Sequence, residues 1–160
     1  MNIFVLDTRL DLCAKYHCDK HIVKMILESA QLLSQAVRMS GLDAGYKITH
    51  KNHPCSIWTR ASIQNYNWLR ELARNLNSEY RYRYGRTENH KSWNMIESLP
   101  TPGLPDIGLT PFAQCMPDEY KATNAVQAYR SYYSHEKADI LKYTKRSAPE
   151  WITKRKVLCH

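Results

Sequence analysis

A row of titratable side chains follows one face of a helix that the sequence predicts near its N-terminus. An α-helix turns by 100° per residue, so side chains three or four positions apart share a face. The face without apolar residues carries His17, His21, Lys24, Glu28, Gln31 and Gln35. A carboxylate within reach of His and Lys side chains can support acid–base chemistry. The alternative is a solvated helix face with an i,i+4 Lys–Glu pair, and the pattern alone leaves both interpretations open.

Metal binding competes for some of these residues. His17 and His21 lie four positions apart, so both rings can share a divalent ion on one helix face. Further ligands would have to come from His50, His53 or Cys55. No recognised zinc spacing occurs, and two neighbouring lysines would repel a cation. We therefore expect neither a metal ion nor another cofactor.

Two later clusters alternate basic and aromatic side chains, RYRYGR at 81–86 and YRSYY at 129–133. Rings stack on bases while cations contact phosphates, which suits a nucleic-acid surface. The alternative is that the tyrosines close the core with their hydroxyls at the surface. Taken with a basic tail at 142–156, the clusters favour binding. The predicted binding residues are His17, Lys20, Lys24, Asn52, His53, Arg60, Arg81, Arg83, Arg86, Tyr129, Arg130, Tyr133 and Trp151.

The overall charge agrees with that interpretation. Lys and Arg number 23 against 15 acidic residues, a net charge of +8, and 11 Tyr and 4 Trp supply amphipathic rings. A basic surface attracts polyanions through phosphate contacts and counterion release. DNA, another nucleic acid or a nucleotide is therefore the expected partner, although charge of this size also serves solubility alone.

Other function classes find no support in the sequence. No Walker loop, dinucleotide fingerprint or GxSxG elbow occurs, which argues against an NTPase, a dehydrogenase and a serine hydrolase. The five Cys are an odd number without CxxC pairs, so a disulfide framework is not expected. The apolar run at 3–6 is too short for a signal peptide or a membrane span. We expect a cytoplasmic protein without membrane contact.

The elements that must position these side chains are predicted to be all-α, in one domain over 1–160 with three main helices. Helices are expected at about 10–39, 54–84 and 123–143, with a short one near 91–97. The first buries a stripe of Ile22, Met25, Ile26, Ser29, Leu32, Leu33 and Ala36. Gly41 and Gly85 end the long helices, and Pro54 suits a first helical position. Four Pro between Leu99 and Pro111 exclude regular structure, so 99–117 is predicted to be an ordered strap.

The segment DKHIVKMILE at 19–28 resembles the first helix of the pyrimidine-dimer DNA glycosylases, small phage repair enzymes also called endonuclease V. In that family a His precedes an Arg-Glu dipeptide by six residues, and the Glu is catalytic. His21 and Glu28 fall on that His and that Glu without a gap. The NHP turn at 52–54 and the PEW segment at 149–151 are also similar to family members.

This resemblance implies an all-α protein that kinks DNA, flips a base and cleaves the glycosidic bond. The family's nucleophile is an N-terminal α-amine, which attacks the sugar C1′ and forms an imine. An α-amine has a pKa of about 7.7–8, so much of it is unprotonated near neutral pH. Because Asn2 is too large for the usual removal of Met, the amine here would be that of Met1, and the family's Arg is replaced by Leu27. We expect Glu28, His21 and Met1 to form the catalytic group.

Two other functions stay open on the same fold. One is a non-catalytic protein that binds a nucleotide or nucleic acid beside Glu28, and the other is a nucleotide N-glycosidase acting on small substrates. All three place Glu28 at the boundary between the core and an open cleft. They also predict that His21 and Lys24 are exposed toward that cleft.

Overall fold

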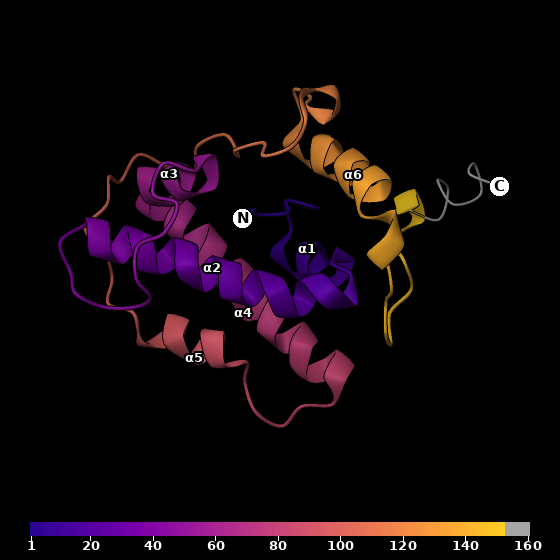
Figure 1. Cartoon of the computed structure of the whole chain (residues 1–160), viewed down its shortest axis with the longest axis horizontal. Coiled ribbons are helices and arrows are strands. Elements are labelled where there is room, and N and C mark those ends of the chain that lie inside the picture. The colour runs from indigo at the N-terminus through magenta and orange to yellow at the C-terminus, as the bar shows by residue number, and fades with distance from the viewer. Residues whose placement is uncertain (153–160) are drawn as a thin grey trace.

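A computed structural model describes residues 1–152 and contains only helices and loops over that range. The elements are α1 (Leu10–Tyr16), α2 (Asp19–Met39), α3 (Pro54–Ala61), α4 (Ile63–Tyr84), α5 (Lys91–Ser98), η1 (Asp118–Tyr120), α6 (Ala125–Glu136) and η2 (Ala138–Ile140). In Figure 1, α2 crosses the front of the molecule and α4 lies behind it, with α5 below and α6 at the upper right. The predicted all-α class is confirmed.

The core lies along the predicted face of α2. Every residue of the expected stripe, from Ile22 to Ala36, is buried, and α2 packs mainly on α4, α5 and α3. On α4 the buried partners include Leu69, Leu72 and Leu76. The helical period of apolar side chains was therefore sufficient to predict which face of α2 is internal.

The single helix expected at 10–39 is wrong, because the chain breaks between α1 and α2. His17 and Cys18 are extended, with ψ of 135° and 164°. The break is stabilised by distant groups. The Tyr133 hydroxyl accepts a hydrogen bond from the Cys18 N–H at 2.9 Å, and the Arg83 guanidinium donates to the carbonyl of His17 at 2.7 Å. These contacts satisfy backbone groups that a continuous helix would have paired internally.

The second long helix is also divided, at Ser62. Its φ and ψ of −153° and 158° are extended, and its hydroxyl accepts from the Asn65 N–H at 3.0 Å as the N-cap of α4. The Ile63 N–H donates to the Pro105 carbonyl at 2.9 Å. The third helix is shorter than the predicted 123–143, because α6 ends at Glu136 and a 3₁₀ turn follows. As expected, Pro54 begins α3 and Gly85, with φ 59°, follows α4.

The proline-rich strap at 99–117 contains no regular element, as predicted, and is held by side chains of α3 and α4. The Asn65 amide pairs with Thr110 in both directions, at 2.7 and 2.9 Å, and Gln64 accepts from the Gly108 N–H at 3.0 Å. The Phe112 ring lies against Trp58 and Trp68. The strap is therefore an ordered part of the fold that delivers Cys115 to the site described below.

A buried charge cluster joins α1, α2 and α4. The Arg83 side chain is fully buried and binds Glu79 at 2.8 Å and Asp19 at 3.2 Å. Its remaining donors reach the carbonyls of Lys15 and His17, and Arg146 also binds Glu79, at 2.6 Å. The prediction that Arg83 contacts nucleic acid is therefore wrong, because its side chain is buried and all three guanidinium nitrogens donate to groups inside the protein.

Burial of histidines and carboxylates makes the fold sensitive to acid. Burial lowers the pKa of His17 to about 4 and that of His21 to about 3. The unfolded chain protonates these rings near pH 6.5 and so binds more protons than the folded state. Stability is therefore expected to fall as pH decreases from about 6.5 to about 4.

The carboxylates extend this loss to lower pH. Burial raises the pKa of Asp19 and Glu79, but hydrogen bonds from Thr144 and Arg83 to Asp19, and from Arg146 and Arg83 to Glu79, outweigh it, so both pKa values are lowered. Stability from these groups is lost as pH falls below about 4.5. Urea midpoints at pH 7, 5.5 and 4 would measure the effect. Equal midpoints at pH 7 and 5.5 would contradict the burial of neutral histidines.

Candidate active site

A polar hollow of about 290 Å³ opens where the N-terminal segment meets α2 and the strap. It is lined by Met1, Asn2, Phe4, His21, Lys24, Glu28, His53, Cys115, Tyr132 and Lys137. The residues therefore come from five separate parts of the chain. Four of the predicted site residues, Met1, His21, Lys24 and His53, lie around Glu28 in this hollow.

Glu28 is the centre of this group. Its side chain is 11% exposed, and its Oε1 atom lies 3.6 Å from the α-amine of Met1. The same oxygen accepts a hydrogen bond from the Asn2 N–H at 3.0 Å, while Oε2 lies 3.9 Å from Lys24 Nζ. Glu28 thus sits at the boundary between core and hollow, as predicted, with two amines within 4 Å. The i,i+4 pair with Lys24 is confirmed as well.

The N-terminus is held in place by Asn2. Its side-chain amide donates to the Cys115 carbonyl at 2.9 Å, and its Oδ1 accepts from the Tyr129 hydroxyl at 2.9 Å. The next four residues, 3–6, are buried, and the Met1 side chain packs on the core. These contacts fix the α-amine beside Glu28 without a helix or strand at this end of the chain.

His21 and Lys24 differ from each other in exposure. The Lys24 side chain is 67% exposed, which confirms the prediction for Lys24, but His21 is only 4% exposed, so that prediction is wrong. The His21 ring stacks on Phe4 at 4.7 Å, and its Nδ1 lies 2.8 Å from the Tyr133 hydroxyl. With its pKa lowered to about 3 by burial, His21 is a neutral wall of the hollow.

Aromatic and cationic side chains line another part of the hollow. Phe4 lies between His21 and Tyr132, whose ring centroid is 6.3 Å away at an interplanar angle of 18°. Lys137 Nζ lies 5.4 Å from the centre of the Tyr132 ring. The hollow therefore combines a flat aromatic side with lysines from α2 and from the end of α6.

A sulfur pair forms another edge of the hollow. Cys55 Sγ and Cys115 Sγ lie 3.2 Å apart, and His53, the N-cap of α3, accepts from the Cys55 N–H at 3.1 Å. The hydrogen bond between the thiols lowers the pKa of Cys115 to about 7. The thiol pair places polarisable sulfur atoms beside the N-terminus.

Three further predicted binding residues lie in the interior instead of at a binding surface. His17, Tyr129 and Tyr133 are fully buried. His17 bonds to the Cys13 carbonyl through Nδ1, Tyr129 holds Asn2, and Tyr133 bridges Cys18 and His21. Their assignment as direct contacts is corrected, because their rings and polar atoms serve the fold.

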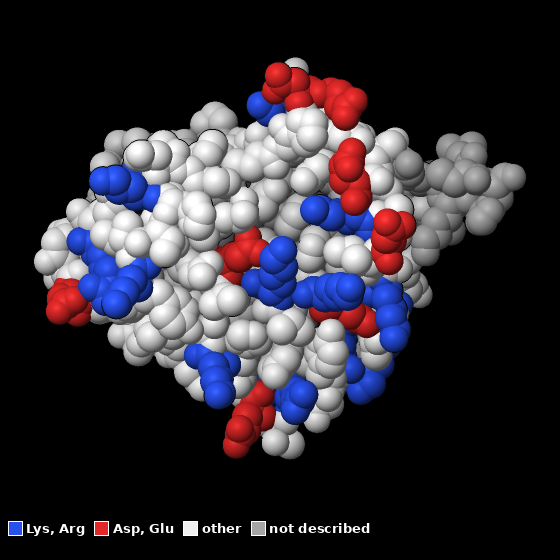
Figure 2. Space-filling model, viewed as in Figure 1, with Lys and Arg blue, Asp and Glu red and all other residues white. Residues whose placement is uncertain are grey.

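The other predicted binding residues do not gather at the hollow. Lys20, Asn52, Arg81 and Arg86 are exposed, and Arg81 lies at the end of α4, where it donates to the Thr87 carbonyl. Half-buried Arg130 binds Asp7 at 2.9 Å and lies 5.5 Å from the Trp151 ring. The tail at 153–156 lies outside the described residues. Figure 2 shows Lys and Arg side chains in a row across the face that α2 crosses, with another group at the left end.

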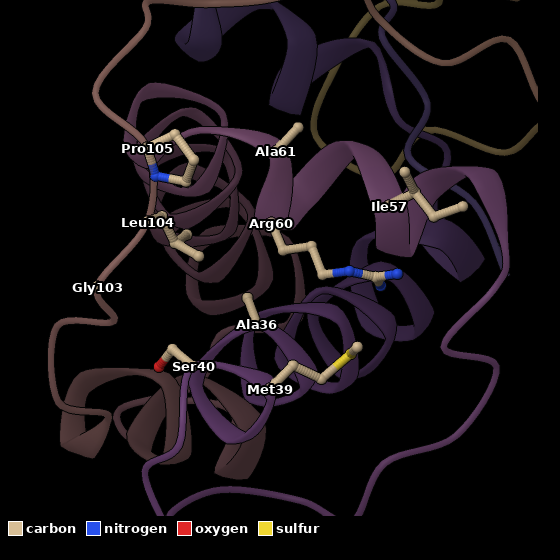
Figure 3. A pocket seen from close by; sticks show the side chains of 9 residues that line it. All are labelled: Ala36, Met39, Ser40, Ile57, Arg60, Ala61, Gly103, Leu104 and Pro105. Atoms are coloured by element: carbon tan, nitrogen blue, oxygen red, sulfur yellow. The ribbon is translucent and has the colours of Figure 1, made fainter.

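Arg60 lines a separate pocket of about 410 Å³ between α2, α3 and the strap. The other lining residues are Ala36, Met39, Ser40, Ile57, Ala61, Gly103, Leu104 and Pro105, seen in Figure 3. Arg60 donates to the Lys51 carbonyl at 2.7 Å. This pocket shares no lining residue with the hollow at Glu28 and is mostly apolar.

The sequence did not indicate Asn2, Phe4, Cys115, Tyr132 or Lys137 as parts of the site. Asn2 was noticed only as a departure from the family, and Tyr132 only as a member of the YRSYY cluster. Lys137 ends α6 as its C-cap. The only sequence feature that could have indicated Lys137 is its position shortly after the basic-aromatic cluster at 129–133.

Comparison with known proteins identifies a family over the N-terminal part of the chain. The family model described as pyrimidine dimer DNA glycosylase matches residues 1–94, which include α1 to α4, Glu28 and His53. No curated protein and no solved structure matches the chain. Among residues 1–152, no helix is both long and apolar enough to cross a membrane. The chain belongs to the pyrimidine dimer DNA glycosylase family.

Proposed function

We propose that this protein is a DNA N-glycosylase with abasic-site lyase activity, in which the α-amine of Met1 is the nucleophile and Glu28 the catalytic carboxylate. Family membership supports a DNA glycosylase-type function. The observation that carries the finer assignment is the 3.6 Å distance between the Met1 nitrogen and Glu28 Oε1 in a polar hollow. An amine and a carboxylate at this distance can act on the same sugar atom and can exchange a proton through one water molecule.

The reaction follows from these two groups. The unprotonated amine attacks C1′ of the flipped nucleotide, and the glycosidic C1′–N bond breaks as the base leaves with its electron pair and gains a proton. Glu28 stabilises the positive charge that develops on the sugar. The attacking nitrogen then loses a proton, and the C1′–O4′ bond breaks as O4′ gains one, which opens the sugar ring and leaves a protonated imine. Removal of a C2′ proton then expels the 3′ phosphate and cuts the strand.

The remaining lining residues suit a flipped nucleotide. A base can stack on the half-buried Tyr132 ring, which buried Phe4 supports from within, since stacking on aromatic side chains is a general mode of holding extrahelical bases. Lys24 and Lys137 stand at the rim as phosphate contacts. His21, buried and neutral, keeps Phe4 in place.

If Lys24 and Lys137 contact phosphates, each contributes to the salt dependence of DNA binding. Lys24→Gln and Lys137→Gln are each expected to weaken DNA binding and to reduce the slope of log K against log salt by about 0.9, the value for one lost phosphate contact. Fluorescence anisotropy with a labelled duplex at several salt concentrations would measure it. Lys91→Gln, at the exposed start of α5, is the matched control. A slope that stays unchanged in both rim variants would contradict their contact with phosphate.

The activity is tested by incubating the protein with abasic-site and ultraviolet-damaged duplexes, with and without borohydride. We expect strand cleavage without borohydride and a covalent protein–DNA adduct with it, since borohydride reduces an imine to a stable amine. Tight binding with neither cleavage nor adduct would instead support the non-catalytic protein. Base release from free nucleotides only would support the nucleotide N-glycosidase.

A further inference from the structure

Three metal-ligating side chains meet at the edge of the hollow. The ligand atoms of His53, Cys55 and Cys115 all lie within 4.8 Å of one another. His53 is the N-cap of α3 and Cys55 lies in its first turn. Cys115 lies near the end of the strap, 60 residues after Cys55. Cys55 is buried, while His53 and Cys115 are half-buried and line the hollow. The tertiary fold brings these three residues together, and they do not form a local metal-binding sequence motif.

Two thiols and an imidazole are a ligand set typical of zinc. Zn²⁺ binds Cys sulfur at about 2.3 Å and His nitrogen at about 2.0–2.1 Å in a tetrahedral arrangement. Tetrahedral angles place two such sulfurs roughly 3.8 Å apart, so the present 3.2 Å separation requires only a small outward movement of the thiols. Two thiolates also cancel the charge of the ion, which offsets the repulsion from the nearby Met1 amine.

The fourth position of such a site would face the hollow. His53 and Cys115 both line it, and Asn2 Oδ1 lies 3.8 Å from Cys55 Sγ on the same side. The His53 ring now accepts a hydrogen bond at Nδ1 from the Cys55 N–H. To bind the metal, either Nδ1 turns toward the ion, or the ring proton moves to Nδ1 and Nε2 becomes the ligand. In both cases the hydrogen bond from the Cys55 N–H is lost and a metal–ligand bond replaces it.

We propose that His53, Cys55 and Cys115 bind a thiophilic divalent cation, Zn²⁺, with one coordination position open to the hollow. The ion joins α3, the strap and, through Asn2, the N-terminal segment. This site does not depend on the proposed glycosylase activity, because it uses neither Glu28 nor the Met1 amine as a required ligand. It also differs from the His17–His21 pair considered from the sequence, since His17 is buried and bonded to Cys13.

The test is a titration of the full chain, kept reduced and stripped of metal, with Co²⁺ and then Zn²⁺. We expect thiolate-to-cobalt charge-transfer absorption and tetrahedral d–d bands that saturate at one ion per chain and disappear when Zn²⁺ is added. Cys55→Ser and Cys115→Ser should each lose the charge-transfer band. His53→Gln should keep it with weaker affinity, and Cys13→Ser, in a buried thiol outside the cluster, should leave it unchanged.

Further measurements keep the outcome decisive. Zn²⁺ should raise the thermal midpoint of the wild type and of Cys13→Ser but not that of Cys115→Ser, and circular dichroism would show that each variant is folded. Absence of cobalt bands in the wild type, with both thiols reduced, overturns the proposal, as does an unchanged band in Cys115→Ser. Glu28→Gln should still bind the ion, so a failure of the glycosylase proposal is distinguishable from a failure of this one.

Discussion

Glu28→Gln is expected to lower the rate of base removal and strand cleavage by about 10²–10⁴-fold, the usual contribution of a positioned acid–base group. The amide is nearly isosteric with the carboxylate and can still accept the Asn2 N–H bond. It cannot take a proton from the Met1 amine or balance positive charge on the sugar. Single-turnover kinetics on an abasic-site duplex would measure the loss.

DNA binding should survive this change or become tighter, because a negative charge near the phosphates is removed. Unfolding in urea would show that the fold is retained. Glu97→Gln, on the exposed side of α5, is the matched control and should keep full activity. Full activity in Glu28→Gln would exclude Glu28 as the catalytic carboxylate.

Arg83→Met is expected to destabilise the protein by about 3–5 kcal/mol, the usual cost of breaking a buried ion pair from one side. Met fills a similar volume but leaves Asp19 without its ion pair. It also removes the hydrogen bonds from Arg83 to the carbonyls of Lys15 and His17, which stabilise the break before α2. Equilibrium unfolding in urea, compared with the wild type, would give the difference.

Arg81→Met on the exposed side of the same helix end is the control, because surface substitutions usually change stability by about 0.5 kcal/mol or less. A loss below about 1 kcal/mol in Arg83→Met, together with weaker DNA binding, would contradict the structural role given to Arg83. It would restore the interpretation made from the sequence alone.

The sequence was most informative where side chains share one helix. The apolar period predicted the buried face of α2, and the polar face beside it predicted that Lys24 and Glu28 lie together. Periodicity also led to the wrong prediction that His21 is exposed. A helical wheel gives the direction in which a side chain points but not which other residues pack against it. His21 points toward the hollow as expected, yet Phe4 and Tyr133 cover it.

Features that depend on distant contacts could not be predicted. Asn2 reaches Glu28 and Tyr129, 26 and 127 residues away, and no local pattern records such pairs. The breaks before α2 and α4 have the same origin, because Tyr133, Arg83 and the strap bind the backbone groups that each break exposes. The break at Ser62 is an exception, because Ser is a common N-cap residue and could have indicated a new helix start. The apolar periodicity continues across it, and the sequence analysis therefore predicted one helix.

The most direct test of the central claim is to locate the amine that is trapped by borohydride. Both the Met1 nitrogen and Lys24 Nζ lie within 4 Å of Glu28, so either could attack C1′ on distance alone. The adduct would be digested with protease and nuclease, and the modified peptide sequenced by mass spectrometry. The account predicts a sugar remnant on the α-amine of Met1, with trapping retained in Lys24→Gln. An adduct on Lys24, or none on an abasic-site duplex that the protein binds, would contradict it.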